Sequence, residues 1–147
     1  MKGIAVRDFQ EKDTEKILQF RKETAGESFP GIEMNRGKAR RAILRHMKRH
    51  PGTVKVAELE GKPIGLVMFK LKAGSLGSYG RITTIFVKKP YRNQGVGAFL
   101  LQEAEKSLLS KGIKRIYAEV TNTNTHSLDF FREHGYTNKR TVVEKRV

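Results

Sequence analysis

The stretch "KKPYRNQGVGAFLLQEAEK", residues 88–106, decides the fold, because it sets two glycines between a β-branched segment and an amphipathic run. Glycine lowers helix stability by about 1 kcal/mol relative to alanine at an interior position. Gly95 and Gly97 at a helix start therefore indicate that another group comes close to the main chain. A strand that ends in such a turn presents N–H groups and the positive end of a helix dipole, which together favour an anion. The alternative is a first helical turn that packs tightly on its neighbour.

The composition describes a folded and strongly basic chain. Its 147 residues fit one domain, 1–147, and 37% hydrophobic with 31% charged residues is typical of a soluble globular protein. The 30 lysines and arginines against 15 acids give a net charge of +15. Such a surplus favours an anionic partner, namely nucleic acid, an acidic protein or a phosphorylated small molecule. A solvated basic surface accounts for it equally well.

Missing residue types exclude several kinds of site. The chain has no cysteine, which removes disulfides, thiol nucleophiles and thiolate metal sites and fits a cytoplasmic protein. The longest apolar run, residues 63–69, is far shorter than the ~20 residues of a membrane helix, so we expect no membrane partner. The first nine residues carry no export signal. His46 and His50 lie four apart without a third ligand, so we expect surface histidines and no metal.

Periodicity and turn residues predict an α/β protein, more specifically an α+β arrangement of helices around a mixed β-sheet. Strands are expected at residues 3–10, 53–60, 63–72, 81–89 and 113–121, with a final strand or strand pair at 136–147. Helices are expected at residues 12–26 and 35–49, from the glycine turn to about 110, and at 124–135. The hairpin over 53–72 should turn at 61–62. Strand, helix and strand within 81–121 should form a right-handed parallel crossover.

The glycine turn fits one phosphate-binding pattern better than two others. The dinucleotide fingerprint G-x-G-x-x-G fails because Leu100 stands where its third glycine belongs, and the Walker pattern fails because Gly-Lys-Ser/Thr is absent. The sequence Arg92-x-x-Gly95-x-Gly97, after a strand ending "IFV" and before an amphipathic helix, resembles the pyrophosphate loop of the GNAT acetyltransferase superfamily.

A second motif supports this resemblance. Residues 124–136, "NTHSLDFFREHGY", resemble the closing motif of the same family. The positions that fall at the family's spacing are Asn124, Ser127, Phe130, Phe131, Gly135 and Tyr136. The resemblance covers essentially the whole chain and implies a GNAT-like fold, a central twisted mixed β-sheet flanked by about four helices. It also implies an acetyl-CoA-dependent enzyme that passes an acetyl group directly to a primary amine of a protein N-terminus, a lysine or a small molecule.

The resemblance further implies where acetyl-CoA would bind. Main-chain N–H groups of Ile85, Phe86 and Val87 would stabilise the developing oxyanion. The pyrophosphate would lie along Arg92, Asn93, Gln94, Gly95, Val96, Gly97 and Ala98, and Asn124 and Phe131 would line the pantetheine arm.

The catalytic residues depart from the commonest family pattern. Many members carry an acid on the strand before the glycine turn, where this chain has Thr83 and Thr84. The next candidate base is Glu119, which resembles the glutamate of the branch that acetylates protein N-termini; the alternative is a surface carboxylate paired with a basic neighbour. Phe131 stands where the family often places a tyrosine that protonates the leaving thiolate. We therefore expect a slower enzyme or a substitute donor, with Tyr136, Tyr91 and His126 as candidates.

The acceptor is the part that the sequence specifies least. Residues 35–50 carry many lysines and arginines and no acid, and an outward basic helix face there would attract an acidic or phosphorylated acceptor. The alternative is a solvated helix. A CoA-binding regulatory module with weak or no catalysis is the main rival to an enzyme. A nucleic-acid partner is not favoured, because Trp and an aromatic-rich basic strand are missing, and a homodimer is compatible with the sequence.

Overall fold

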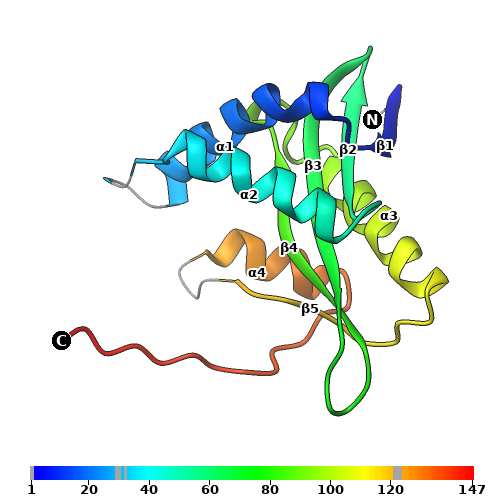
Figure 1. Ribbon diagram of the computed structural model, residues 1–147, viewed down its shortest axis with the longest axis vertical. Coiled ribbons are helices and arrows are strands. Elements are labelled where there is room, and N and C mark those ends of the chain that lie inside the picture. Colours follow the sequence, from blue (N-terminus) through cyan, green and yellow to red (C-terminus); the bar gives the residue numbers. More distant parts are fainter. Residues whose placement is uncertain (1, 29–30, 32, 121–123) are drawn as a thin grey trace.

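The computed structural model describes residues 2–28, 31, 33–120 and 124–147 and contains a five-stranded mixed sheet (Figure 1). The strands are β1 (Ile4–Asp8), β2 (Val54–Leu59), β3 (Lys62–Lys72), β4 (Tyr79–Val87) and β5 (Ile116–Ala118). The helices are α1 (Thr14–Ser28), α2 (Arg36–Arg49), α3 (Val96–Ser110) and α4 (Thr125–Glu133), with short 3₁₀ turns η1 (Glu11–Asp13) and η2 (Lys89–Tyr91). The strands lie in chain order, antiparallel from β1 to β4 and parallel between β4 and β5, which confirms the predicted mixed sheet.

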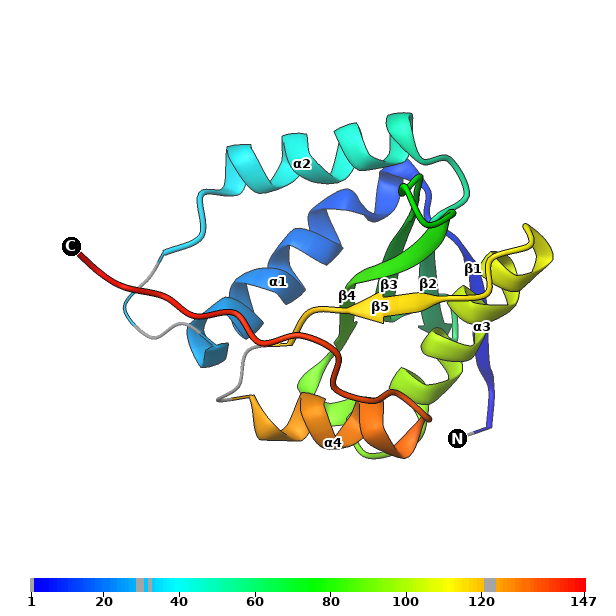
Figure 2. The ribbon, with the colours of Figure 1, turned by 90° about the horizontal axis from the view of Figure 1, so that it is seen from below.

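Helices cover both faces of the sheet. Figure 2 shows α1 and α2 on one face and α3 and α4 on the other. Under α1, Phe20 stacks on Phe86 of β4 with ring centroids 5.8 Å apart, and the opposite face buries Phe69 and Leu100 completely. Because strand side chains alternate, the apolar run of β3 fills both layers. None of the described helices is long and apolar enough to cross a lipid bilayer.

The β2–β3 hairpin turns one residue earlier than predicted. Glu60 and Gly61 have φ angles of 50° and 74°, and Lys62 already belongs to β3. Two positive φ angles at the centre of a two-residue turn match the right-handed twist of the flanking strands. Gly61 supplies the second of them without steric cost, so the position of the glycine rather than the Gly-Lys pair sets the turn.

An extra residue interrupts the pairing of β3 with β4. Met68 pairs with Thr84 and Phe69 with Ile82, so Thr83 is an additional residue that opposes no residue of β3. Its hydroxyl donates to the Met68 carbonyl at 3.1 Å. Such a bulge shifts the alternation by one residue, which is why Ile82 and Ile85, three apart, both pack toward α3.

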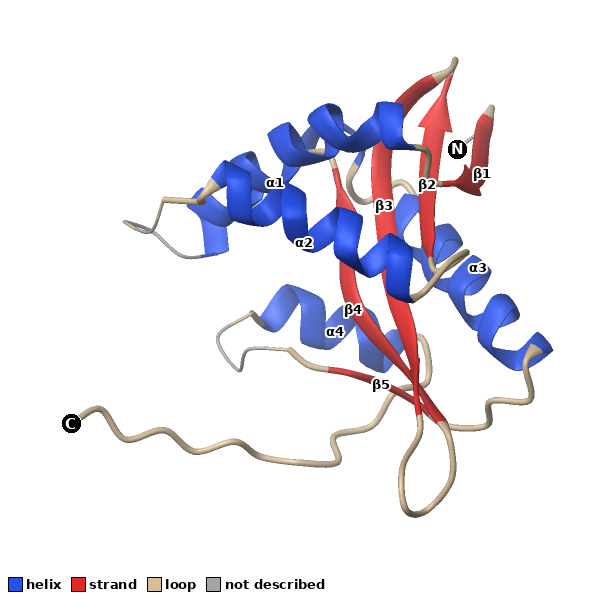
Figure 3. Ribbon diagram, viewed as in Figure 1, coloured by secondary structure: helices blue, strands red, loops and turns tan. Residues whose placement is uncertain are grey.

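The prediction of a strand or strand pair at residues 136–147 is wrong. This segment follows α4 as an extended tail without strand pairing (Figure 3). Val142 and Val143 are 87% and 89% exposed. As neighbours in an extended chain they point in opposite directions, so one covered face could bury only one of them. β5 is three residues long and offers little ladder for the tail to join.

Candidate functional site

The glycine turn ends β4 and starts α3 without a side-chain cap. Gly95 is the N-terminal cap residue of α3, with φ of 84°, and its lack of a side chain leaves no hydroxyl or carboxylate to satisfy the first N–H groups. The first helical hydrogen bond in α3 runs from the Phe99 N–H to the Gly95 carbonyl at 3.0 Å. The N–H groups of Val96, Gly97 and Ala98 precede that bond, and the predicted anion cradle depends on them and on the helix dipole.

Two of the basic side chains between β4 and this helix start point to different places. The Arg92 Nε donates to the Val87 carbonyl at 2.9 Å, which fixes the arginine between the end of β4 and the start of α3. Asn93 has a φ of 60°, a left-handed value that a non-glycine residue adopts rarely, and it lets the turn double back after η2. Lys88 lies over the Phe20 ring, 5.5 Å from its centroid.

The two glycines serve different purposes. A Cβ on Gly95 would meet nothing within 4 Å, so this glycine is required by its positive φ alone. A Cβ on Gly97 would lie 3.5 Å from the Phe130 ring of α4 and 3.8 Å from Val87, which is ordinary contact. Packing therefore does not demand a glycine at 97, and approach of a ligand remains the better reason for it.

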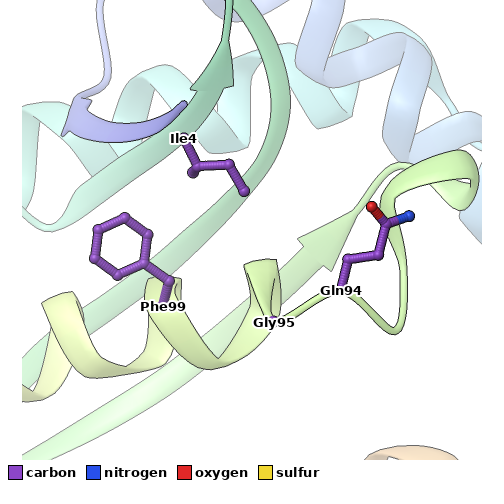
Figure 4. Close-up of a pocket in the computed structure, with 4 residues that line it drawn as sticks. All are labelled: Ile4, Gln94, Gly95 and Phe99. Carbon is purple, nitrogen blue, oxygen red and sulfur yellow. The ribbon is translucent and has the colours of Figure 1, made fainter. Parts of the chain in front are cut away.

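A cavity of about 310 Å³ opens on the β1 side of the turn (Figure 4). It is lined by Ile4, Gln94, Gly95 and Phe99. The Gln94 amide donates to the Pro90 carbonyl at 3.0 Å, so this side chain is fixed within the turn. Ile4 and Phe99 were not predicted to belong to the site, since only the pairing of β1 with β2 brings the N-terminal strand here.

β4 extends beyond its parallel partner. Pairing with β5 ends at Ile82 and Ala118, whereas β4 continues to Val87, and Figure 3 shows the two strands diverging. The Lys88 N–H donates to the Ile64 carbonyl of β3 at 2.8 Å. Since alternate residues direct their N–H groups to opposite sides, Ile85 and Val87 direct theirs to the side that β5 has left.

Two of the three predicted oxyanion residues thus face the divergence. Phe86 directs its N–H toward β3 by the same alternation, and its side chain is buried against α1, 5% exposed. The donors available to a ligand between the strands are the N–H groups of Ile85 and Val87. The family resemblance implies the region, but the pairing phase of β4 with β3 beyond the bulge at Thr83 determines which amides face the opening.

Glu119 lies where β4 and β5 diverge, on the face of the sheet opposite α3. Ile116 and Ala118 of β5 pack toward α3, and alternation along the chain places the Glu119 side chain on the other face of the sheet. The Glu119 carboxylate forms an ion pair with the Arg81 guanidinium, with 2.7 Å between Oε1 and Nη2. The Glu119 side chain is 78% exposed and the Arg81 side chain is 32% exposed. This is the paired surface carboxylate that the sequence offered as the alternative, and its exposure leaves it accessible to an acceptor.

The closing motif holds α4 against α3. The Asn124 side chain caps α4 by accepting from the Ser127 N–H at 3.1 Å. The Phe131 ring packs against Tyr136 at 5.1 Å, and the Tyr136 hydroxyl donates to Glu105 of α3 at 2.9 Å. Burial, followed by the Glu105 carboxylate, raises the pKa of Tyr136 far above its usual value. That phenol is committed to a structural hydrogen bond and is a poor substitute proton donor.

The sheet divergence beside an uncapped helix start agrees with comparison to known proteins. The sequence pattern of the acetyltransferase (GNAT) family matches residues 14–136. The chain belongs to this family. It is an acetyl-CoA-dependent N-acetyltransferase, and members of the GNAT family use acetyl-CoA as the acetyl donor.

Two relatives resemble the chain in sequence, and one solved structure resembles it in fold. An N-alpha-acetyltransferase of Sulfolobus acidocaldarius is 26% identical over 133 residues, 84% of this chain and 74% of the relative. One from Sulfurisphaera tokodaii is 22% identical over 144 residues, 92% and 81% of the two chains. The fold matches a PaiA N-acetyltransferase of Thermoplasma acidophilum, solved with coenzyme A, at a TM-score of 0.83 and 22% identity over 95% of this chain and 92% of that one.

Proposed function

We propose that the GNAT chain binds the diphosphate of acetyl-CoA at the start of α3 and acetylates a primary amine between β4 and β5. The observation that carries this assignment is the junction of an uncapped helix start with the Ile85 and Val87 amides on the open side of β4. Acetyl-CoA supplies an activated acyl group as a thioester. The two amides can donate to the negative charge that develops on the attacked carbonyl oxygen, and donors fixed in advance lower the barrier by several kcal/mol.

Glu119 would take the proton from the attacking amine. An α-amino group, with an ordinary pKa of about 7.7–8.0, needs less help than a lysine near 10.4. The exposed carboxylate can accept that proton directly or through one water once it exchanges its contact with Arg81. The archaeal relatives named N-alpha-acetyltransferases support the α-amine of a polypeptide as the acceptor.

Phe131 leaves the departing thiolate without a phenol at the family position. Its ring is enclosed by Phe130 and Tyr136, at 5.3 Å and 5.1 Å. A thiol with a pKa near 8.5, by analogy with cysteine, can leave as an anion at neutral pH. The proposed enzyme works without this acid and turns over more slowly than one that has it.

The basic α2 helix contributes less charge to an acceptor than its composition suggests. Arg40 contacts Glu15 of α1 at 2.6 Å, and Arg36 pairs with the same carboxylate. The arginines and lysines of the C-terminal half of α2 retain their outward charge. An acidic acceptor therefore remains part of the proposal, as do the cytoplasmic location and the homodimer that the sequence allows.

A panel of amines tests the proposed function. CoA release is followed with acetyl-CoA and three acceptors: a peptide with its α-amine, the same peptide with a blocked N-terminus and one lysine, and an aminoglycoside. The proposal requires acetyl-CoA binding by calorimetry and fastest release with the α-amine. Binding without release from any acceptor would identify an inert CoA-binding module, and absence of binding would remove the proposed cradle altogether.

A further inference from the structure

Cationic and aromatic side chains gather around Glu119 on one face of the sheet. We call this group the cationic patch; it consists of Lys70, Lys72, Tyr79, Arg81, Tyr117, Glu119 and Arg140. Cross-strand register places Lys70 beside Arg81, Lys72 beside Tyr79, and Arg81 beside Tyr117. All seven are at least partly exposed. The patch therefore forms a continuous accessible surface that starts at the candidate base.

Like charges are held close together in this patch. Burial, followed by Lys72 and Arg81, lowers the pKa of Lys70 below its ordinary value. Burial, followed by the same two lysines, also lowers the pKa of His50 at the end of α2. Repulsion among neighbouring cations is unfavourable unless an anion offsets it. Within the described residues, Glu119 is the one acidic group paired there, and Arg81 already contacts it.

The two tyrosines give the patch a rigid base. Tyr79 and Tyr117 meet edge to face with ring centroids 5.3 Å apart. The Arg140 guanidinium lies 5.9 Å from the Tyr117 centroid, within the range of a cation–π contact. This contact brings the tail to β5 and adds a fourth positive group to the surface.

One exposed carboxylate beside several cations matches a polypeptide whose positively charged N-terminus is followed by acidic residues. We propose that the cationic patch binds the acidic residues of a polypeptide whose N-terminal amine lies at Glu119, so that the enzyme prefers acidic N-termini. The inference rests on the proposed function, because it assigns the acceptor of the same site. The exposed Glu119 carboxylate would repel the phosphates of a nucleic acid, whereas it attracts the amine of a peptide.

The length of the patch predicts which peptide positions are read. Glu119 lies one residue beyond the row of Ile82 and Ala118, and the row of Lys72 and Tyr79 lies three residues before it along β4, which places Glu119 four residues from that row. Four residues of strand span about 13 Å, which an extended peptide also covers with about four residues. Acidic side chains at positions 2 to 5 of the acceptor would therefore meet the cations.

Matched peptides test the inference. Two peptides share the first residue and carry either glutamates or glutamines at positions 2 to 5, and kcat/KM is measured for each at low and high salt. We expect the acidic peptide to be preferred about tenfold at low salt, as several weak surface ion pairs together allow, and the preference to shrink as salt rises. The double variant Lys70→Gln/Lys72→Gln and the tail variant Arg140→Gln should each reduce it.

The control is Lys2→Gln/Lys62→Gln, which removes the same charge at the other end of the sheet. It should retain the full preference. Equal rates for both peptides, or a preference that survives the patch variants, would overturn the inference and leave the proposed function standing. Acetylation of neither peptide would count against the proposed function itself. Inhibition by single-stranded RNA that the patch variants relieve, without any acidic preference, would assign the surface to nucleic acid and overturn the inference.

Discussion

Replacing the two glycines separately distinguishes ligand approach from packing. Gly97→Ala adds a methyl group at 3.5 Å from the Phe130 ring, a distance that needs no rearrangement. Because alanine has less freedom in the unfolded chain than glycine, the variant should unfold with a free energy higher by about 0.4–1 kcal/mol. For a chain of this size that raises the melting temperature by about 1–4 °C.

The same methyl group should weaken acetyl-CoA binding. It lies beside the main-chain N–H groups of the first α3 turn, where the diphosphate is proposed to come close. Loss of one hydrogen bond to a charged oxygen costs about 1.5–3 kcal/mol, or roughly tenfold to a hundredfold in Kd. Gly97→Ala should therefore be more stable than the wild-type chain and bind acetyl-CoA at least tenfold more weakly.

Gly95→Ala provides the comparison. Its Cβ would enter open space, but φ is 84°, and a non-glycine residue pays about 1–2 kcal/mol in this left-handed region. We expect lower stability for this variant, opposite in sign to Gly97→Ala. Thermal unfolding without ligand and calorimetric titration with acetyl-CoA measure both quantities. An unchanged Kd in a stabilised Gly97→Ala variant would show that the diphosphate does not approach this turn.

Three further substitutions probe the chemistry and the fold. Glu119→Gln should lower kcat/KM by about 10²–10⁴ while leaving the acetyl-CoA Kd unchanged, since general-base help is lost and the cradle is intact; a loss below threefold would exclude it as the base. Phe131→Tyr should raise kcat if thiolate departure limits turnover, and unchanged kcat would show that the missing hydroxyl has no effect. Burial raises the pKa of Asp13, but hydrogen bonds from Arg7 and the Gln10 N–H outweigh it and lower the pKa overall. A carboxylate whose pKa is lowered in the folded state stabilises the fold above its unfolded pKa of about 3.9, and this stabilisation is lost as the pH falls. Asp13→Asn should therefore lower the free energy of unfolding by about 1.5–3 kcal/mol at pH 7, measured by denaturant unfolding. The difference between the variant and the wild-type chain should shrink below about pH 4.

The parts that the sequence predicted correctly depend on neighbouring residues. The glycine turn, the β2–β3 hairpin and the amphipathic α3 each combine a local conformational preference with a periodicity that can be read within about 20 residues. The pairing of Glu119 with Arg81 joins residues 38 positions apart and depends on the parallel register of β4 and β5. No local pattern contains that register, so the sequence could state the pairing only as an alternative.

The strand predicted at residues 136–147, which the structure does not contain, also shows that a local pattern cannot specify a pairing partner. β-branched residues favour an extended chain, and the segment is indeed extended, but a strand also requires a neighbouring ladder and a covered face. β5 supplies only Ile116–Ala118, and the tail contacts it through Arg140 rather than through main-chain pairing. The prediction confused a preference for extended backbone with the presence of a partner.

The bulge at Thr83 joins the packing of the sheet to the chemistry of the site. Before it, Gly80 directs its N–H toward β5, where it donates to the Arg115 carbonyl at 2.9 Å. If the same residues paired regularly, without a bulge, that alternation would continue through Thr84 and Phe86, and the amides of Ile85 and Val87 would face β3 instead. The bulge reverses the phase at the point where β5 departs, so the N–H groups on the diverging side are those of Ile85 and Val87. The bulge thus determines which N–H groups face the divergence where acetyl-CoA is proposed to bind, and the core accommodates it because Ile82 and Ile85 both still pack toward α3.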